Sequence, residues 1–289
     1  MNLSIIIPTF NRLSILKLAL FDLYKSIDYA RNKSQSLIYN IIVIDDGSED
    51  GTSEYLRNNH PRVHLLNGDG NLWWTGAVNL GSKYAIENLN SDYITLWNDD
   101  VMPYINYFEK LHKKILQFSY SIIGSQIFEF DTKKKWSSSL KLNRFTGISS
   151  QNTAVINNKS NLFFYWLPAM GTTIPAKIIL ELDFWDRDNF PQYFGDADFT
   201  IRASKTGYQI IFSDDLVIYN KTEFSYHPAS NFNQFISSIS SQNIKSRYNY
   251  TTRFKFYKKH CYPLFWIPTY LMYYIKYSLV FLKNSLTKN

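Results

Sequence analysis

The sequence predicts an α/β fold built on a mainly parallel central sheet flanked by helices. Through the first hundred residues, short runs of β-branched and other apolar residues alternate with segments whose apolar residues recur at helical spacing. Three of the apolar runs end in polar clusters, at the position where parallel sheets carry their binding sites. The 289-residue chain is 45% hydrophobic, which is enough for a sizeable core and excludes disorder throughout.

The first expected element is a buried strand at residues 3–7, a β-branched apolar run that ends at Pro8. Residues 13–26 follow with apolar side chains at helical intervals. The same reasoning predicts further strands at 38–44, 63–66 and 93–97, and helices at 52–58 and 79–88.

The second half is less regular. Residues 131–161 are polar and rich in Ser and Asn, which predicts an irregular hairpin or insertion over a site, or simply a solvated loop. Gly207 has the position of a residue that ends a helix in the left-handed conformation. We expect helices beginning at 178–182 and at 198–206, and strands at 208–212 and 217–219.

Acidic residues gather where apolar runs end. Adjacent carboxylates repel unless a cation or hydrogen-bond donors offset their charge, and Mg²⁺ or Mn²⁺ prefers such oxygen ligands. Asp-Asp pairs of this kind occur at 45–46 and 99–100, where a solvated turn is the alternative. In a third group, Asp198 is expected to be a helix N-cap. Asp196 would precede that helix and project into a cleft, or be a plain surface acid.

Four motifs follow one another along the chain: Pro-Thr-Phe-Asn-Arg at 8–12, Asp-Asp-Gly-Ser at 45–48, Asn-Asp-Asp at 98–100 and Phe-Gly-Asp-Ala-Asp at 194–198. In this order they resemble glycosyltransferase family 2, which has the GT-A fold. The stretch 70–79 (Gly-Asn-Leu-Trp-Trp-Thr-Gly-Ala-Val-Asn) resembles a rhamnosyltransferase-like subgroup.

The resemblance covers about residues 1–230. It implies a GT-A domain with a nucleotide-binding half, 1–100, and an acceptor half, 101–230, followed by a basic, aromatic helical extension, 231–289.

The resemblance also implies a role for each matching position. Asp196 would be the catalytic base of an inverting transfer, and Asp100 would bind Mg²⁺ or Mn²⁺. The donor would be a UDP- or dTDP-linked sugar, and the acceptor a saccharide or lipid-linked saccharide in surface polysaccharide assembly. The positions expected to bind the donor are Pro8, Thr9, Asn11, Arg12, Asp45, Asp46, Trp74, Gly76, Asn79, Asn98 and Asp99.

The sequence departs from the family pattern at two positions. Asn98 replaces the first Asp of an Asp-x-Asp motif, so a metal would rest mainly on Asp100. Gly195 replaces a Glu that is common just before the base, which affects acceptor positioning more than chemistry. His227 lies where some relatives place a metal-binding histidine, and a structural role for this lone His is the alternative.

The C-terminal residues are basic and aromatic. Residues 224–289 contain nine Lys or Arg and no Asp or Glu, whereas the rest of the chain is nearly neutral, with 22 basic and 24 acidic residues. Such asymmetry favours an anionic partner. Residues 262–282 carry one charge, two prolines and five tyrosines, which is more typical of a helix on a membrane surface than of a span. Packing back onto the domain is the alternative, and no nucleic-acid motif is present.

The N-terminal residues lack the pattern of a secretory signal, and the single cysteine, Cys261, excludes an intrachain disulfide, so we expect a cytoplasmic protein at the inner face of the membrane.

Residues 68–73 begin like a dinucleotide fingerprint but lack its third glycine. A nucleotidyltransferase, or a carbohydrate- or nucleotide-binding module without turnover, remains as the alternative.

Overall fold

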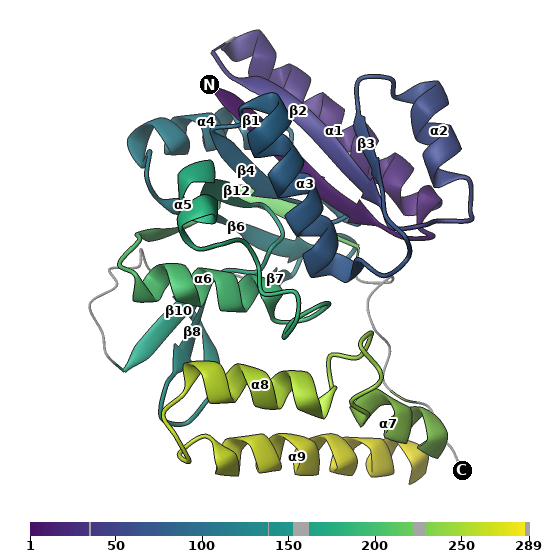
Figure 1. Cartoon of the computed structure of the whole chain (residues 1–289), viewed down its shortest axis with the longest axis vertical. Coiled ribbons are helices and arrows are strands. Elements are labelled where there is room, and N and C mark those ends of the chain that lie inside the picture. The colour runs from purple at the N-terminus through teal and green to yellow at the C-terminus, as the bar shows by residue number, and fades with distance from the viewer. Residues whose placement is uncertain (35, 138, 153–161, 222–228, 230, 287–289) are drawn as a thin grey trace.

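The computed structural model of the chain describes residues 1–34, 36–137, 139–152, 162–221, 229 and 231–286 (Figure 1). In the first half, strands and helices alternate as expected: β1 (Asn2–Thr9), α1 (Leu13–Lys33), β2 (Ile38–Asp45), α2 (Thr52–Asn59), β3 (His64–Asn67), α3 (Trp73–Leu89), β4 (Tyr93–Leu96), β5 (Val101–Pro103) and α4 (Tyr107–Gln117). The second half contains β6 (Ile122–Glu129), β7 (Lys135–Ser137), β8 (Ser139–Asn143), β9 (Ser149–Asn152), β10 (Phe163–Trp166), β11 (Thr172–Pro175), α5 (Ala176–Glu181), α6 (Gly195–Lys205), β12 (Ile210–Asn220), α7 (Phe232–Ile239), α8 (Tyr250–His260) and α9 (Ile267–Leu286).

The central sheet has the strand order β3-β2-β1-β4-β11-β6-β12-β5, with β7 paired to β6. β1 is parallel to β2 and β4, β2 is parallel to β3, and β6 is parallel to β12. Among the described strands of this sheet, only β11, β5 and β7 pair antiparallel to their neighbours. The predicted mixed, mainly parallel sheet is confirmed.

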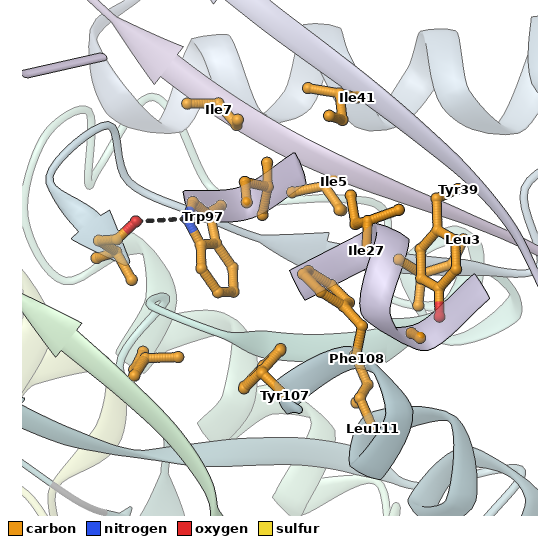
Figure 2. Packing of buried hydrophobic residues seen from close by; sticks show 14 of the residues in the cluster. Leu3, Ile5, Ile7, Ile27, Tyr39, Ile41, Trp97, Tyr107, Phe108 and Leu111 are labelled. Atoms are coloured by element: carbon orange, nitrogen blue, oxygen red, sulfur yellow. Dashed lines mark hydrogen bonds between the residues drawn. The ribbon is translucent and has the colours of Figure 1, made fainter. Parts of the chain in front are cut away.

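Side chains alternate across β1 and fill two core layers, because successive residues of a strand point to opposite faces. Leu3, Ile5 and Ile7 pack with α1 and α4 in one layer, which also holds Tyr107 and Phe108, and Figure 2 shows part of this cluster. The other layer holds α3, α5 and α6 against the opposite face of the sheet. Helices therefore cover both faces, and the strand ends stay open at the edge.

Several boundaries differ from those expected. The predicted helix at 79–88 begins at Trp73, since Asp46 supplies the acceptors for its first N–H groups. The two predicted strands at 208–219 form one strand, β12, with a register irregularity between Ser213 and Val217. Gly207 follows α6 with a φ of 92°, as predicted.

The polar segment 131–161 contributes β7 and a second, antiparallel sheet of order β10-β8-β9. A hairpin was predicted here and β8 and β9 form one, while residues 153–161 lie outside the described residues. α6 packs on β10, so this small sheet lies next to the helix that begins at Gly195 (Figure 1).

The C-terminal helices pack on this part of the molecule. Phe256 and Tyr257 of α8 are buried with Phe190 and Ile201 in a core cluster of their own. α9 runs alongside α8, and Tyr274 Oη donates to the carbonyl of Tyr248 at 3.0 Å (Figure 1). Among the helices described, none has both the length and the apolar character that a membrane crossing needs. The predicted domain boundary at residue 230 lies outside the described residues.

Candidate active site

The polar clusters that follow β2, β1 and β4 lie side by side at one edge of the central sheet. Thr9 pairs with Asp45, and the N–H of Asp46 donates to the Thr9 carbonyl at 3.0 Å. After β4, the N–H of Trp97 donates to the Ile6 carbonyl at 2.9 Å, which brings the next cluster beside the first. The expected convergence of these segments at the carboxyl ends of parallel strands is confirmed.

A cavity of about 470 Å³ opens at this edge, and we call it the donor cavity. Seven of the positions expected to bind the donor line it: Pro8, Thr9, Arg12, Asp46, Trp74, Asn98 and Asp99. Its other lining residues are Phe10, Gly70, Trp73, Ala77, Gln192, Tyr193 and Lys245. Of these, Phe10, Gly70, Trp73 and Ala77 lie within the recognised motifs, whereas Gln192, Tyr193 and Lys245 belong to no motif.

Four expected positions are not among the lining residues and have partners elsewhere. Asn11 Oδ1 accepts from the N–H of Glu49, and Asp45 accepts from the N–H of Ser48. Asn79 and Trp185 exchange two hydrogen bonds, at 2.9 and 3.0 Å, and a Cβ on Gly76 would meet the Arg187 guanidinium.

Asp46 organises the loop before α3. Its two carboxylate oxygens accept hydrogen bonds from the N–H groups of Gly70, Leu72 and Trp73, at 2.9 to 3.2 Å. Trp73 has a φ of 55°, a left-handed conformation that is strained for a bulky residue. The carboxylate therefore holds this strained turn in place against the donor cavity.

Arg12 joins the two adjacent acids that follow β4. Its guanidinium bonds Asp99 at 2.8 Å and Asp100 at 2.9 Å, and Thr9 Oγ1 donates to Asp99 at 2.8 Å. Burial raises the pKa of Asp99 to about 7, although the Arg12 charge acts in the opposite direction. Asp100 Oδ1 is buried and has no hydrogen-bond partner among the described residues.

Trp74 connects this cluster to the motif at 194–198. Its Nε1 donates to Asn98 Oδ1 at 3.3 Å, and its N–H donates to Gln192 Oε1 at 3.1 Å. A Cβ on Gly195 would lie 3.4 Å from the Trp74 ring and 2.5 Å from Thr75 Oγ1. The side chains of α3 thus occupy the space that a larger residue at position 195 would need.

Asp196 lies in the first turn of α6, not ahead of the helix as expected. Its Oδ1 accepts from the N–H of Ala197 at 2.8 Å, and its Oδ2 accepts from the N–H of Ala169 at 3.0 Å. Burial raises the pKa of Asp196, although these hydrogen bonds stabilise the ionised form. The result is a fixed carboxylate that binds a proton more readily than a solvated one.

The prediction that Asp198 is an N-cap is wrong. Phe194 holds the N-cap position, and Asp198 is a fully buried residue inside α6. It is bonded by Arg202 at 2.9 Å, by Lys259 at 2.7 Å and by His260 at 2.8 Å. Burial alone would raise its pKa, but the bonds from His260 and Lys259 outweigh burial and lower the pKa of Asp198 to about 2.

The described residues contain no cluster of three or more His, Cys, Asp or Glu that could hold a metal ion. His227, the second predicted metal ligand, lies outside the described residues. Among the described carboxylates, Asp100 has a buried oxygen that no hydrogen bond engages, which suits a hard cation that takes its other ligands from water and phosphate.

The family model of glycosyl transferase family 2 matches residues 4–170, which is more than half of the chain. The chain therefore belongs to glycosyl transferase family 2. It is similar to the dolichyl-phosphate beta-glucosyltransferase ALG5C of Trichomonas vaginalis, with 27% identity over 113 residues. That match covers 38% of this chain and 32% of the relative, so the chain spans about a third of that protein's length.

Solved structures of TarS from S. aureus share the fold. TarS 1–349 has a TM-score of 0.56 at 13% identity, and the match covers 77% of this chain and 61% of that one. TarS 1–349 in complex with UDP-GlcNAc has a TM-score of 0.55 at 12% identity, covering 86% and 74% of the two chains. At such identities the likeness establishes the fold, and the predicted GT-A fold is confirmed.

Proposed function

We propose that this protein transfers a sugar from a nucleoside diphosphate sugar to an acceptor hydroxyl, with inversion at the sugar carbon. The observation that carries the proposal is the position of Trp74. Its indole bonds Asn98 and packs on Gly195, so the segment 98–100 and the start of α6, which carries Asp196, both contact one side chain. Asp99 lines the cavity, and the proposal places Asp100 and Asp196, which are not among its lining residues, near the two ends of the reacting bond of a bound donor.

In the proposed reaction, the acceptor oxygen attacks the anomeric carbon while the bond from that carbon to the diphosphate oxygen breaks. The hydroxyl proton passes to Asp196, and the electron pair of the broken bond leaves with the diphosphate. The raised pKa of Asp196 makes it a better base than a solvated aspartate, and general-base catalysis contributes about 10²–10⁴-fold. Because attack and departure take place on opposite faces, the configuration inverts.

We further propose that Asp100 holds a Mg²⁺ or Mn²⁺ ion through its Oδ1, which is buried and lacks a hydrogen-bond partner in the described structure. When bound, such an ion would neutralise negative charge that develops on the departing diphosphate. Asp100 Oδ2 stays engaged by Arg12, which fixes the carboxylate in one orientation.

The proposal is tested by nucleotide binding and turnover together. In a thermal-shift panel of UDP, dTDP and GDP with and without Mn²⁺, one nucleotide should raise the Tm, and Mn²⁺ should increase the rise. The matching nucleotide sugars should then be consumed, and NMR of the product should show the opposite anomeric configuration. A protein whose Tm responds to no nucleotide, and that consumes no nucleotide sugar, would contradict the proposed function.

The proposal for the donor sugar and the acceptor is based on the resemblance of the sequence motifs to the family. The segment 70–79 favours a rhamnosyl or other hexosyl donor, and the acceptor would be a saccharide or lipid-linked saccharide in surface polysaccharide or glycan assembly. Screening products against short saccharides with and without a lipid anchor separates these acceptors.

We also propose that α9 rests on an anionic membrane surface, at the inner face of the membrane. Residues 271, 272, 275, 279 and 282 share one face of the helix, and each of their side chains is more than half exposed. The opposite face is buried, with Tyr277 and Phe281 packed on Phe235 of α7. Exposed Lys276 and Lys283 lie along one edge of the apolar stripe, and their positive charges complement acidic headgroups.

Vesicle co-sedimentation tests the membrane proposal. The protein should bind phosphatidylglycerol vesicles and not pure phosphatidylcholine. Replacing Ile275 and Leu279 together by Ser should weaken binding about tenfold or more, because two apolar side chains lose their burial in the bilayer. Leu116→Ser, on the exposed side of α4, is the matched control. The membrane proposal would be refuted if the double substitution left vesicle binding unchanged. It would also be refuted if α9 proved to be a dimer interface and not a membrane-binding surface.

A further inference from the structure

Two cations line the donor cavity, and they differ in their partners. Arg12 is already bonded to both Asp99 and Asp100, so its charge is offset by two carboxylates. Lys245 comes from the segment between α7 and α8, and none of the described carboxylates forms an ion pair with its Nζ. Lys245 is therefore the lining cation whose charge is not neutralised within the described structure.

Two aromatic rings that line the cavity lie near the Lys245 ammonium group. Its Nζ lies 5.6 Å from the centre of the Phe10 ring and 5.7 Å from that of Trp73. The backbone of Trp73 is held in its strained left-handed conformation by Asp46, which lines the same cavity. The ammonium group is thereby placed beside the cavity, although its side chain remains exposed.

The segment that carries Lys245 is anchored at its far end. Asn249 Nδ2 donates to the carbonyls of Ser241 at 3.0 Å and Asn243 at 3.1 Å, which closes residues 241–249 into a compact loop. The following helix, α8, is joined to α6 through the buried bond between His260 and Asp198. Lys245 is thus presented by a loop fastened to the same helix that carries Asp196.

Carboxylates in the cavity favour a further cation when a nucleoside diphosphate binds there. Asp46 and Asp99 line it, and a nucleoside diphosphate would bring further negative charge next to them. Arg12 is bonded to both acids that follow β4, and a metal ion on Asp100 would compensate charge at that one point. A lysine ammonium is a compact charge with three donors, which suits phosphate oxygens that approach from different directions.

We propose that Lys245 Nζ binds the diphosphate of the nucleotide sugar, so that the C-terminal loop 240–249 forms part of the donor site. This inference rests on the proposed function and adds a binding group that lies beyond the region matched by the family model.

Isothermal titration with UDP and with uridine tests the proposal, because only UDP carries the diphosphate. Lys245→Ala should weaken UDP binding about tenfold or more, as expected for loss of a charge-assisted bond, and should leave uridine binding unchanged. Lys245→Arg should retain most of the UDP affinity. Lys258→Ala, which removes an exposed charge of α8 that does not line the cavity, should match wild type.

Each outcome decides between distinct conclusions. Equal UDP affinity of Lys245→Ala and wild type overturns the role of Lys245 and leaves the proposed function intact. An equal loss in Lys258→Ala also overturns it, because a general effect of positive charge would then explain the result. Failure of the wild-type protein to bind UDP, dTDP or GDP contradicts the proposed function itself.

Discussion

Trp74 Nε1 donates a hydrogen bond to Asn98 Oδ1 at 3.3 Å, and the ring of the same indole packs against Gly195. Two acidic motifs that are almost a hundred residues apart in the chain therefore contact one side chain of α3. The relative placement of these motifs depends on an aromatic residue that carries no charge and performs no chemistry.

We expect Trp74→Phe to lower kcat/KM about tenfold, because the substitution removes a hydrogen bond worth about 1 kcal/mol and loosens the contact at Gly195. The Tm should change little. Steady-state kinetics measure the effect, with Trp136→Phe in the exposed strand β7 as the control. Equal losses in both variants would show that position 74 has no special role.

Asp196→Asn should lower kcat by at least about 100-fold while nucleotide affinity stays the same, because only the proton acceptor is lost. In the wild type, burial raises the pKa of Asp196, and the reaction needs the ionised form. The rate should therefore fall as the pH drops through a value above the ordinary aspartate pKa of about 3.9. Asp188→Asn, at an exposed neighbouring position, should keep wild-type rates; a near-wild-type Asp196→Asn would reject the base assignment.

Asp100→Asn should abolish the gain in nucleotide affinity that Mn²⁺ provides, because an amide oxygen is a weaker ligand for a hard cation than a carboxylate. Titration of UDP with and without Mn²⁺ gives this difference directly. The exposed Asp131→Asn serves as the control. If Asp100→Asn and wild type respond to Mn²⁺ equally, Asp100 does not hold the ion.

Stability should fall when the solution is made acidic, and the buried pair of Asp198 and His260 accounts for part of this loss. Burial lowers the pKa of His260 to about 4, so between about pH 6.5 and pH 4 the unfolded chain binds a proton that the folded chain does not. Asp198, with a pKa lowered to about 2, adds a further loss below about pH 4.

Urea unfolding of His260→Ala measures the same pair at neutral pH. The variant should lose about 1–3 kcal/mol of unfolding free energy, because Asp198 keeps its charge and loses a buried donor. Its stability should also depend less on pH between 6.5 and 4 than that of the wild type. His64→Ala, at a half-buried histidine bonded to Tyr84, is the control for loss of a ring.

Gly195→Ala should destabilise the protein by about 1–3 kcal/mol, because the new Cβ would stand 2.5 Å from Thr75 Oγ1. Combining it with Thr75→Ser, which keeps the hydroxyl but removes the methyl group, should recover little. Combining it with Thr75→Ala should recover part of the loss, even though the bond to the Phe190 carbonyl disappears. Additive losses in both double variants would exclude this contact as the cause.

Local patterns were sufficient to predict the strands that form the site. β1, β2 and β4 are short apolar runs ended by polar clusters, and their parallel pairing follows from the alternation with helices. The motifs at 8–12 and 98–100 therefore led to six of the fourteen lining residues. Resemblance to a family added the expected base, Asp196, which no periodicity could identify.

Long-range contacts explain what the sequence could not reveal. Asp198 has the local context of an N-cap, but its partners Lys259 and His260 lie some sixty residues further along the chain. Lys245 lines the cavity although it comes from the segment between α7 and α8, far along the chain from the other lining residues of the motifs. Asn79 and Gly76 lie in the motif at 70–79, yet their closest partners are in the segment before α6.

The buried carboxylate of Asp198 also determines how the protein can be shortened for experiments. A fragment that ends near residue 230, where the catalytic domain was expected to stop, would lack Lys259 and His260 and leave Asp198 with Arg202 as its only charged partner inside an apolar core. Such a fragment should express poorly or precipitate. Truncated versions for crystallisation need to retain the chain through Cys261, although the family model ends at residue 170.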